Sequence, residues 1–157
     1  MMARRGYEVE VTDENFIIAV KPDGEQVVAF FSPYPKLIVK HIQMYIVDMR
    51  QLDVDHAIIV YKDVVTSFTL SLISKLTDFT FELFATRDLQ YNITTHVLQP
   101  KFERVKGAEH HVLMEKYGNK LSKLLREDPI ARFYHFQKGD IIRVTRRTGF
   151  VTYRITQ

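Results

Sequence analysis

Residues 128–154 constrain the fold of this chain more than any other stretch. They begin with Asp128 and Pro129, which together suit the start of a helix: the carboxylate can accept a free backbone N–H, and proline has no N–H to leave unpaired. A short helix is therefore predicted from Pro129, with Gly139 in the turn that follows it. Two runs then alternate apolar and polar residues, and Thr148-Gly149 between them indicates a β-hairpin. The apolar positions of these runs are Ile142, Val144, Val151, Tyr153 and Ile155.

The first half of the chain predicts a mixed sheet. Phe16–Val20 and Val27–Phe31 are β-rich runs, and Pro22-Asp23-Gly24 between them is typical of a hairpin turn. His56–Tyr61 is a continuous apolar run, as expected for an interior strand of a parallel sheet. Phe79–Leu83 alternates and indicates a further strand, so a strand–helix–strand unit is predicted here.

Two helices are predicted in this half. One should run from about Lys36 to Leu52, because its apolar residues recur at spacings of three and four. The second should begin after Thr66 as its N-cap, with Phe68 among the residues facing the core. The first helix's apolar stripe consists of Ile38, Ile42, Tyr45, Met49 and Leu52, and the second helix's stripe of Phe68, Leu72, Ile73 and Leu76.

In the second half, residues 92–99 indicate an extended run that ends at Pro100. A helix is predicted over Glu109 to Tyr117, with Gly118 ending it. Leucines 121, 124 and 125 are expected to pack ahead of the Asp128 cap.

Charge divides the 157 residues unevenly. Residues 1–88 contain 9 Lys and Arg against 13 Asp and Glu, whereas residues 89–157 contain 13 against 6. This asymmetry favours two modules, 1–88 and 89–157, in different surroundings. For the basic second half, a solvated basic face is at least as good an explanation as contact with nucleic acid. The chain has no cysteine, which excludes disulfides and cysteine-ligated zinc. No apolar run is long enough for a membrane span.

The sequence contains only weak matches to known catalytic and metal-binding motifs. A nuclease of α/β type needs an Asp and a Glu-x-Lys-like pair to hold Mg²⁺, but the residue two after Glu82 is Phe84. The adjacent His110-His111 point about 100° apart on a helix, so a surface pair is favoured over a metal site. No Ser, Cys or carboxylate follows His96 at a spacing that would indicate a catalytic pair. A buried or interface histidine is therefore favoured over a general base.

The run DPIARFYHFQKGDIIRVTRRTGFVTYR resembles the C-terminal assembly domain of the shared subunit 5 of eukaryotic RNA polymerases, a family with an archaeal counterpart. Residues 92–100 resemble the opening of the same domain. Two positions depart from the family: His135 replaces a glycine after the short helix, and Arg147-Thr148-Gly149 replaces a Ser-Glu-Thr loop. The matching positions are Asp128, Pro129, Ala131, Arg132, Lys138, Gly139, Arg146, Tyr153 and Arg154.

The first half resembles, less closely, the α/β jaw domain that precedes the assembly domain in eukaryotes. Arg4–Tyr7 resembles the end of a helical lead-in, and residues 58–67 resemble a strand and the threonine turn after it. In the family this turn faces downstream duplex DNA. The resemblance thus implies that Lys62, Thr66 and Ser67 lie near DNA, while helix capping explains Thr66 equally well.

The resemblance therefore implies an α+β chain: a jaw-like α/β domain with a mixed sheet, then a small α+β assembly domain ending in a β-hairpin. It implies a non-catalytic subunit of a multisubunit DNA-directed RNA polymerase, active in transcription. The expected partners are the largest subunit, other polymerase subunits and downstream DNA, with no cofactor, metal or membrane. The expected location is the nucleus, or a viral factory or virion if a virus encodes the chain; the sequence leaves both hosts open.

Five residues are candidates for the partner interface, while Asp128, Pro129 and Gly139 are expected to set backbone shape. For each arginine among the candidates, an intramolecular ion pair is the alternative. The alternative function is a free-standing nucleic-acid-binding or transcription-factor module, which predicts DNA affinity of the isolated chain that falls steeply with salt. The five candidates are Arg132, Arg146, Arg154, Tyr153 and His96.

Overall fold

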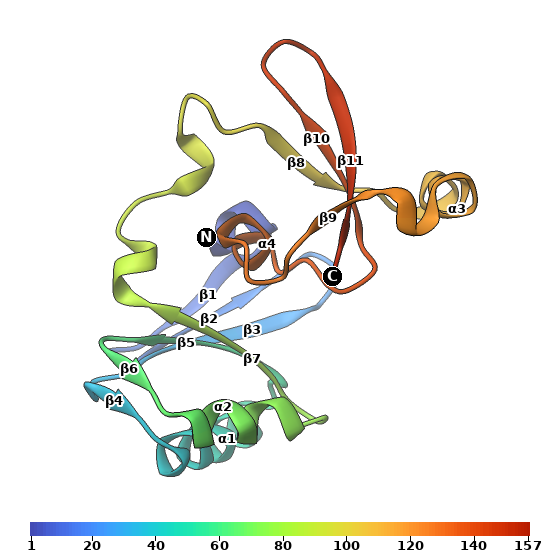
Figure 1. Ribbon diagram of the computed structural model, residues 1–157. Coiled ribbons are helices and arrows are strands. Elements are labelled where there is room, and N and C mark those ends of the chain that lie inside the picture. Colours follow the sequence, from blue (N-terminus) through green and yellow to red (C-terminus); the bar gives the residue numbers. More distant parts are fainter. The chain divides into compact units, whose positions relative to one another are not determined.

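The computed structural model describes residues 1–118 and 120–157, which divide into two compact units, Met2–Tyr91 and Asn92–Gln157 (Figure 1). Both units combine helices with a β-sheet, so the predicted α+β class is confirmed. Among the described residues, no helix is long and apolar enough to cross a membrane.

A five-stranded mixed sheet forms the centre of the first unit, in the order β1-β2-β3-β5-β7. The first three strands pair antiparallel, whereas β3, β5 and β7 pair parallel, so β5 is an interior parallel strand as predicted. Short 3₁₀ helices, η1 and η2, precede and follow the sheet. The bounds are η1 Met2–Arg5, β1 Glu8–Thr12, β2 Phe16–Val20, β3 Gln26–Phe31, β5 His56–Tyr61, β7 Thr80–Ala85 and η2 Thr86–Leu89.

The predicted hairpin of β2 and β3 is confirmed. Its turn is closed by two backbone hydrogen bonds: the Lys21 N–H donates to the Glu25 carbonyl at 2.9 Å, and the Gly24 N–H donates to the Lys21 carbonyl at 2.9 Å. Gly24 has a φ of 90°, a conformation that glycine adopts without steric cost.

Helix α1, Val39–Leu52, buries Ile42, Tyr45 and Met49 against this sheet. The prediction that the helix starts at Lys36 is wrong. Lys36–Leu37 instead forms a short strand, β4, which pairs in parallel with β6, Val64–Val65. That pairing joins segments far apart in the sequence, and it fixes the backbone of Lys36 and Leu37 as strand before the helix can begin.

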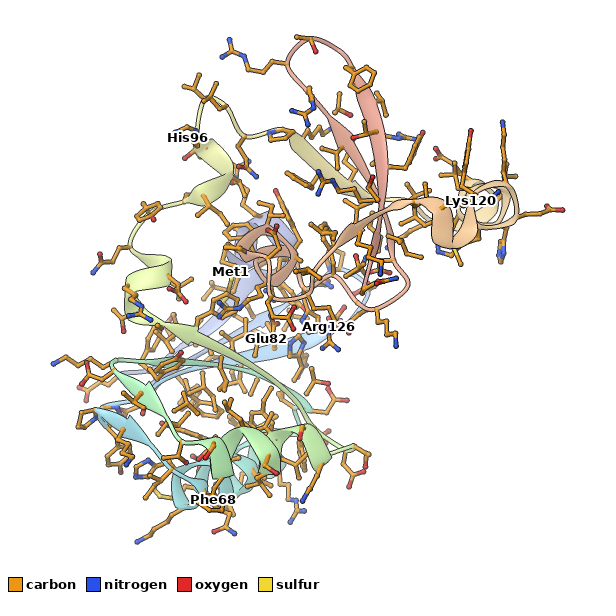
Figure 2. All side chains as sticks on the ribbon, viewed as in Figure 1. Met1, Phe68, Glu82, His96, Lys120 and Arg126 are labelled. Atoms are coloured by element: carbon orange, nitrogen blue, oxygen red, sulfur yellow. The ribbon has the colours of Figure 1, made fainter. Side chains whose placement is uncertain are left out.

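Helix α2, Ser67–Lys75, lies on the same face of the sheet as α1 (Figure 1). The predicted burial of Phe68 is wrong, because its side chain is 80% exposed and projects outward (Figure 2). Thr69 is fully buried in its place, and its hydroxyl donates to the Leu37 carbonyl at 3.4 Å. The helix is thus rotated so that a polar residue satisfies the backbone of β4.

The second unit contains a four-stranded sheet in the order β8-β10-β11-β9. Its helix α4 and the hairpin of β10 and β11 occupy the stretch for which they were predicted. Ile130 and Ala131 of α4 pack with Ile142 and Val144 of β10. The bounds are η3 Ile93–Thr95, β8 Lys101–Arg104, α3 Gly107–Lys116, η4 Gly118–Lys120, β9 Ser122–Leu124, α4 Pro129–Tyr134, β10 Ile141–Thr145 and β11 Val151–Thr156.

Two predictions for this unit need correction. The segment from Asn92 is not extended throughout, because Asn92 caps the 3₁₀ helix η3 by accepting a hydrogen bond from the Thr94 N–H at 3.0 Å. A capping side chain offers the backbone an alternative to strand pairing. Of the leucines expected to pack before α4, Leu124 is buried, but Leu125 is exposed.

Candidate interaction surfaces

Asp128, Pro129 and Gly139 shape the backbone around α4. The Asp128 carboxylate accepts a hydrogen bond from the Ile130 N–H at 2.9 Å, and Pro129 occupies the first turn of the helix. Gly139 has a φ of 90° and donates its N–H to the Thr156 carbonyl at 2.9 Å, which ties the turn to β11. These contacts are the cap, the helix start and the turn that the sequence predicts.

The α4 helix ends at His135, the residue that replaces the glycine expected from the family resemblance. His135 adopts the left-handed conformation, with φ 53° and ψ 47°, and its N–H donates to the Arg132 carbonyl at 3.1 Å. The helix therefore keeps a left-handed C-cap even without glycine, at a steric cost that glycine would avoid.

Sequence reasoning missed Arg104, which fastens this helix end to the sheet. From the last position of β8, its guanidinium donates to the His135 carbonyl at 2.9 Å and lies 2.9 Å from a carboxylate oxygen of Asp140. It also lies over the Phe136 ring, 5.6 Å from the centroid. The sequence carried no signal for this arrangement, because these residues lie far from Arg104 along the chain.

Tyr153 and Arg154, both predicted to contact a partner, lie on opposite faces of the four-stranded sheet. Arg154 pairs with Ile142, on the face that packs against α4. Tyr153 pairs with Arg143, on the face that carries Ile141 and packs against α3. A flat partner surface could therefore not contact both side chains at once.

On the α3 face, Tyr153 already has intramolecular contacts. Its hydroxyl donates to Glu109 at 3.2 Å, and the Arg143 guanidinium binds the same carboxylate oxygen and lies 6.0 Å from the Tyr153 ring centroid. The hydrogen bond from Arg143 lowers the pKa of Glu109, and the bond from Tyr153 acts in the same direction. This cluster is exposed, so its contribution to stability is small.

The candidate arginines differ in their surroundings. Arg132 lies half-buried on α4, Arg154 lies half-buried on β11, and Arg146 is exposed at the hairpin turn. Within the described part of the chain, neither Arg146 nor Arg154 forms a side-chain ion pair or hydrogen bond. Their guanidinium groups are therefore available to a partner's carboxylates.

The hairpin tip contacts the loop that carries His96. β8 and β10 pair so that Lys101 lies opposite Thr145, and Arg147 donates to the Val97 carbonyl at 3.5 Å. His96 is exposed on the loop before β8, which excludes the buried alternative and leaves the interface one, and its Nδ1 accepts the Leu98 N–H at 3.2 Å (Figure 2).

Large apolar side chains are exposed around this tip. Val97 is 67% exposed, Leu98 is 78% exposed and Phe150 is 62% exposed. We call these three residues, with His96 and Arg146, the hairpin-tip patch. Exposed apolar residues clustered beside polar and charged ones are typical of protein interaction sites, and sequence reasoning identified only the two polar members.

The turn before α2 carries the residues predicted to lie near DNA. The Thr66 hydroxyl accepts the Thr69 N–H at 3.2 Å, and the Thr66 N–H donates to the Leu37 carbonyl at 3.2 Å. Thr66 is therefore an N-cap, as the sequence suggested. Lys62 and Ser67 are exposed on either side of it. The prediction that these residues approach DNA stays a prediction.

Glu82, the residue considered for a nuclease, is buried in a network of intramolecular contacts. Its two carboxylate oxygens accept hydrogen bonds from Arg5 at 2.6 and 2.7 Å, and one of them lies 2.8 Å from His56 Nε2. The side chains of Arg5 and Glu82 are only 5% and 8% exposed. This carboxylate therefore binds the Arg5 guanidinium and the His56 ring of its own chain and fastens η1 to β5 and β7.

Comparison with known proteins shows the family. Residues 91–156 match the family of the C-terminal domain of RNA polymerase Rpb5. Over 95% of its length, the chain is 30% identical to "DNA-directed RNA polymerases I, II, and III subunit rpabc1" of Dictyostelium discoideum, and the match covers 85% of that protein. The chain belongs to the Rpb5 family of RNA polymerase subunits. The resemblance seen in the C-terminal motif is thereby confirmed.

Two further relatives of this Rpb5-family chain differ in how much of the chain they match. "DNA-directed RNA polymerases IV and V subunit 5B" of Arabidopsis thaliana is 27% identical, with 98% of this chain and 84% of that protein covered. A "Putative DNA-directed RNA polymerase subunit 454R" of Invertebrate iridescent virus 6 is 39% identical, but the match spans 48% of each chain. Relatives thus include both cellular and viral proteins.

Proposed function

We propose that this chain docks on the largest subunit of a multisubunit DNA-directed RNA polymerase through its second unit, and that its first unit lies beside downstream duplex DNA. Family membership makes the chain a polymerase subunit in transcription. The second unit serves as the assembly domain predicted for residues 89–157, and the first as the jaw-like domain predicted for residues 1–88. The chain contributes structure and no catalysis, in a nucleus or, for a viral host, in a viral factory or virion.

The observation that carries the docking proposal is the hairpin-tip patch. It combines exposed apolar side chains with a guanidinium that has no intramolecular partner in the described residues. Aromatic and arginine side chains that become buried contribute much of the binding energy in protein interfaces, and the surrounding apolar contacts exclude water. The charge of residues 89–157 fits a partner surface that carries carboxylates. Arg132 and Arg154, on the α4 side of the sheet, provide a second area of contact.

Co-purification from host cells or infected cells tests the docking. The tagged chain should recover polymerase large subunits, and Arg146→Glu with Phe150→Asp should abolish recovery, because it reverses a charge and places a carboxylate at an apolar contact. Lys116→Glu with Val112→Asp makes the same chemical changes on the exposed face of α3 and is the matched control. Undiminished recovery with the hairpin-tip variant would contradict the docking assignment.

A second double variant tests Arg132 and Arg154 independently of the hairpin tip. Arg132→Glu with Arg154→Glu should weaken recovery of the large subunits if these residues bind partner carboxylates. Recovery equal to that of the unaltered chain would remove both residues from the interface and leave the hairpin-tip patch as the docking surface.

The DNA proposal rests on Lys62 and Ser67, which are exposed beside the capped N-terminus of α2. Contacts of this kind recognise the phosphate backbone and no base sequence. Because the chain has no cysteine, Ser67→Cys provides a single attachment point for a photo-crosslinker. In assembled polymerase on a DNA template, crosslinks to downstream DNA are expected from this position.

Ser74→Cys, near the other end of α2, is the matched control and should give far fewer crosslinks. Equal crosslinking from both positions, or none from Ser67→Cys, would overturn the DNA proposal while leaving the docking proposal intact. The isolated chain is expected to bind DNA weakly, since its first unit is acidic. Strong, salt-sensitive binding by the isolated chain would instead favour a free-standing nucleic-acid-binding module.

A further inference from the structure

The sheet of the first unit is unevenly covered by its helices. α1 and α2 pack over β3, β5 and β7 (Figure 1). Phe16 and Ile18 of β2 remain only partly buried at the margin of this core. Val11 of β1 pairs with Ile18 and is exposed. An apolar part of the sheet face therefore continues beyond the edge of α1.

A groove of about 410 Å³ opens at this edge, between β2, β3, the loop after β3 and α1. Aromatic rings form much of its wall. Phe30 and Tyr45 stack with their ring centroids 4.7 Å apart, and Phe16 lies tilted against Phe30 at 6.2 Å. Phe31 and Tyr34 complete the lining on the side of the loop. The π-faces of such rings attract cations.

Two buried hydroxyl groups lie beside this groove. The Tyr45 and Ser32 hydroxyls are neighbours, and neither forms a hydrogen bond of normal geometry with the described residues. Burial raises the pKa of Tyr45, the hydrogen-bonding interaction with the Ser32 hydroxyl opposes the shift, and the electrostatic effects of Tyr34 and Asp48 add to it. A buried polar atom left without a partner costs free energy that a ligand's hydrogen bond would recover.

Asp48 gives the groove its charge. It lines the wall from α1, is half-buried, and forms no ion pair or hydrogen bond with the described residues. Among the described residues that line the groove there is no lysine or arginine, and Asp13 and Glu14 directly precede the lining residue Asn15. The groove is therefore apolar and negatively charged.

We propose that this groove binds an arginine side chain presented by an apolar segment of a partner protein. The guanidinium plane is weakly hydrated, stacks on aromatic rings and donates two parallel hydrogen bonds to a carboxylate. Asp48 accepts those bonds, the Tyr45 hydroxyl oxygen accepts a further N–H, and the neighbouring rings contact the rest of the segment. The proposal concerns the first unit alone and does not depend on the hairpin-tip patch.

Nuclear magnetic resonance of the ¹⁵N-labelled full chain tests the site. The probe is the blocked peptide acetyl-Leu-Arg-Leu-amide, and its control contains citrulline, which has the shape of arginine without the charge. The arginine peptide should shift the backbone amide signals of Tyr34, Tyr45 and Asp48 and should bind about tenfold more tightly than the citrulline peptide. Equal affinities, shifts confined to other residues, or no shifts would overturn the proposal.

Variants distinguish a contribution of the Asp48 carboxylate itself from a contribution of the overall negative charge. Asp48→Asn should reduce arginine-peptide affinity about tenfold, to the level of the citrulline peptide. Asp53→Asn removes the same charge at the C-cap of α1, where asparagine tolerates the left-handed backbone, and should leave affinity unchanged. Tyr45→Phe should keep the fold and lower affinity by a smaller factor. Equal losses from Asp48→Asn and Asp53→Asn, or full affinity in both Asp48→Asn and Tyr45→Phe, would contradict the assignment.

Discussion

The network around Glu82 in the first unit and the hairpin tip in the second unit use arginine in opposite ways. Arg5 is buried and donates to both oxygens of Glu82, so its charge is neutralised inside the chain. Arg146 is exposed and has no side-chain partner among the described residues. Removing one partner of a buried arginine ion pair destabilises a fold strongly, whereas an exposed, unpaired arginine beside apolar side chains suits an interface. Substitutions should therefore affect stability in the first region and association in the second.

The largest effect on stability is expected for Glu82→Gln. The change leaves the Arg5 guanidinium buried without its counter-charge, which typically costs about 3–5 kcal/mol. Urea denaturation followed by amide signals of the first unit measures this loss. Glu82→Leu with Arg5→Met should recover much of it, because both charges are then removed. A loss below about 1 kcal/mol for Glu82→Gln would show that the network does not hold the unit together.

Arg104→Met should have an intermediate effect and lower the free energy of unfolding of the second unit by about 1–2 kcal/mol. The substitution removes the hydrogen bond to the His135 carbonyl and the ion pair with Asp140, but the site is partly exposed and solvent screens the charges. Amide exchange of α4 and of the turn at Gly139 should accelerate. Arg126→Met, at an exposed position of the same unit, is the comparison and should change little.

Glu25 should make a smaller, pH-dependent contribution to the free energy of unfolding. Burial alone would raise its pKa, but hydrogen bonds from Lys21 and Tyr7 outweigh burial and lower it. A carboxyl group with a lowered pKa in the folded state stabilises that state above its unfolded pKa, near 4.3, and the contribution disappears as pH falls through the folded pKa. Because Glu25 is half-exposed, the effect should stay below about 1 kcal/mol. Over this acidic range, the free energy of unfolding should change less with pH in Glu25→Gln than in the wild type. The same pH dependence in both proteins would contradict the assignment.

The smallest effect on stability is expected for Arg146→Gln. An exposed side chain without intramolecular partners should change the free energy of unfolding by no more than about 0.5 kcal/mol. The same variant should weaken recovery of polymerase large subunits. A stability loss comparable to that of Arg104→Met would place Arg146 with the paired arginines and break the comparison between the two regions.

Features that depend on neighbouring residues were predictable from the sequence. The Asp128 cap, the β2–β3 turn and the β10–β11 hairpin arise from local hydrogen bonds and turn residues, and all three are present. Thr66 was likewise recognised as an N-cap. Local chemistry decides these structures, so short-range patterns suffice to find them.

Features that depend on distant contacts were not predictable. The β4 strand exists because Lys36 and Leu37 pair with Val64 and Val65, and that pairing also turns Thr69 inward in place of Phe68. The hairpin-tip patch likewise needs β8 to pair with β10, which brings the Val97 backbone to the side chain of Arg147 at the hairpin turn. A pattern of apolar spacing within one segment has no access to such pairings.

Hydrogen–deuterium exchange of the chain, free and within assembled polymerase, tests the central claim most directly. The claim is that the second unit docks through its hairpin tip. Amides of residues 96–98 and 146–150 should exchange rapidly in the free chain and become strongly protected in the complex, while the outer face of α3 should change little. If residues 96–98 and 146–150 exchanged equally fast in both states, with protection confined to other segments, the hairpin tip would not be the docking surface.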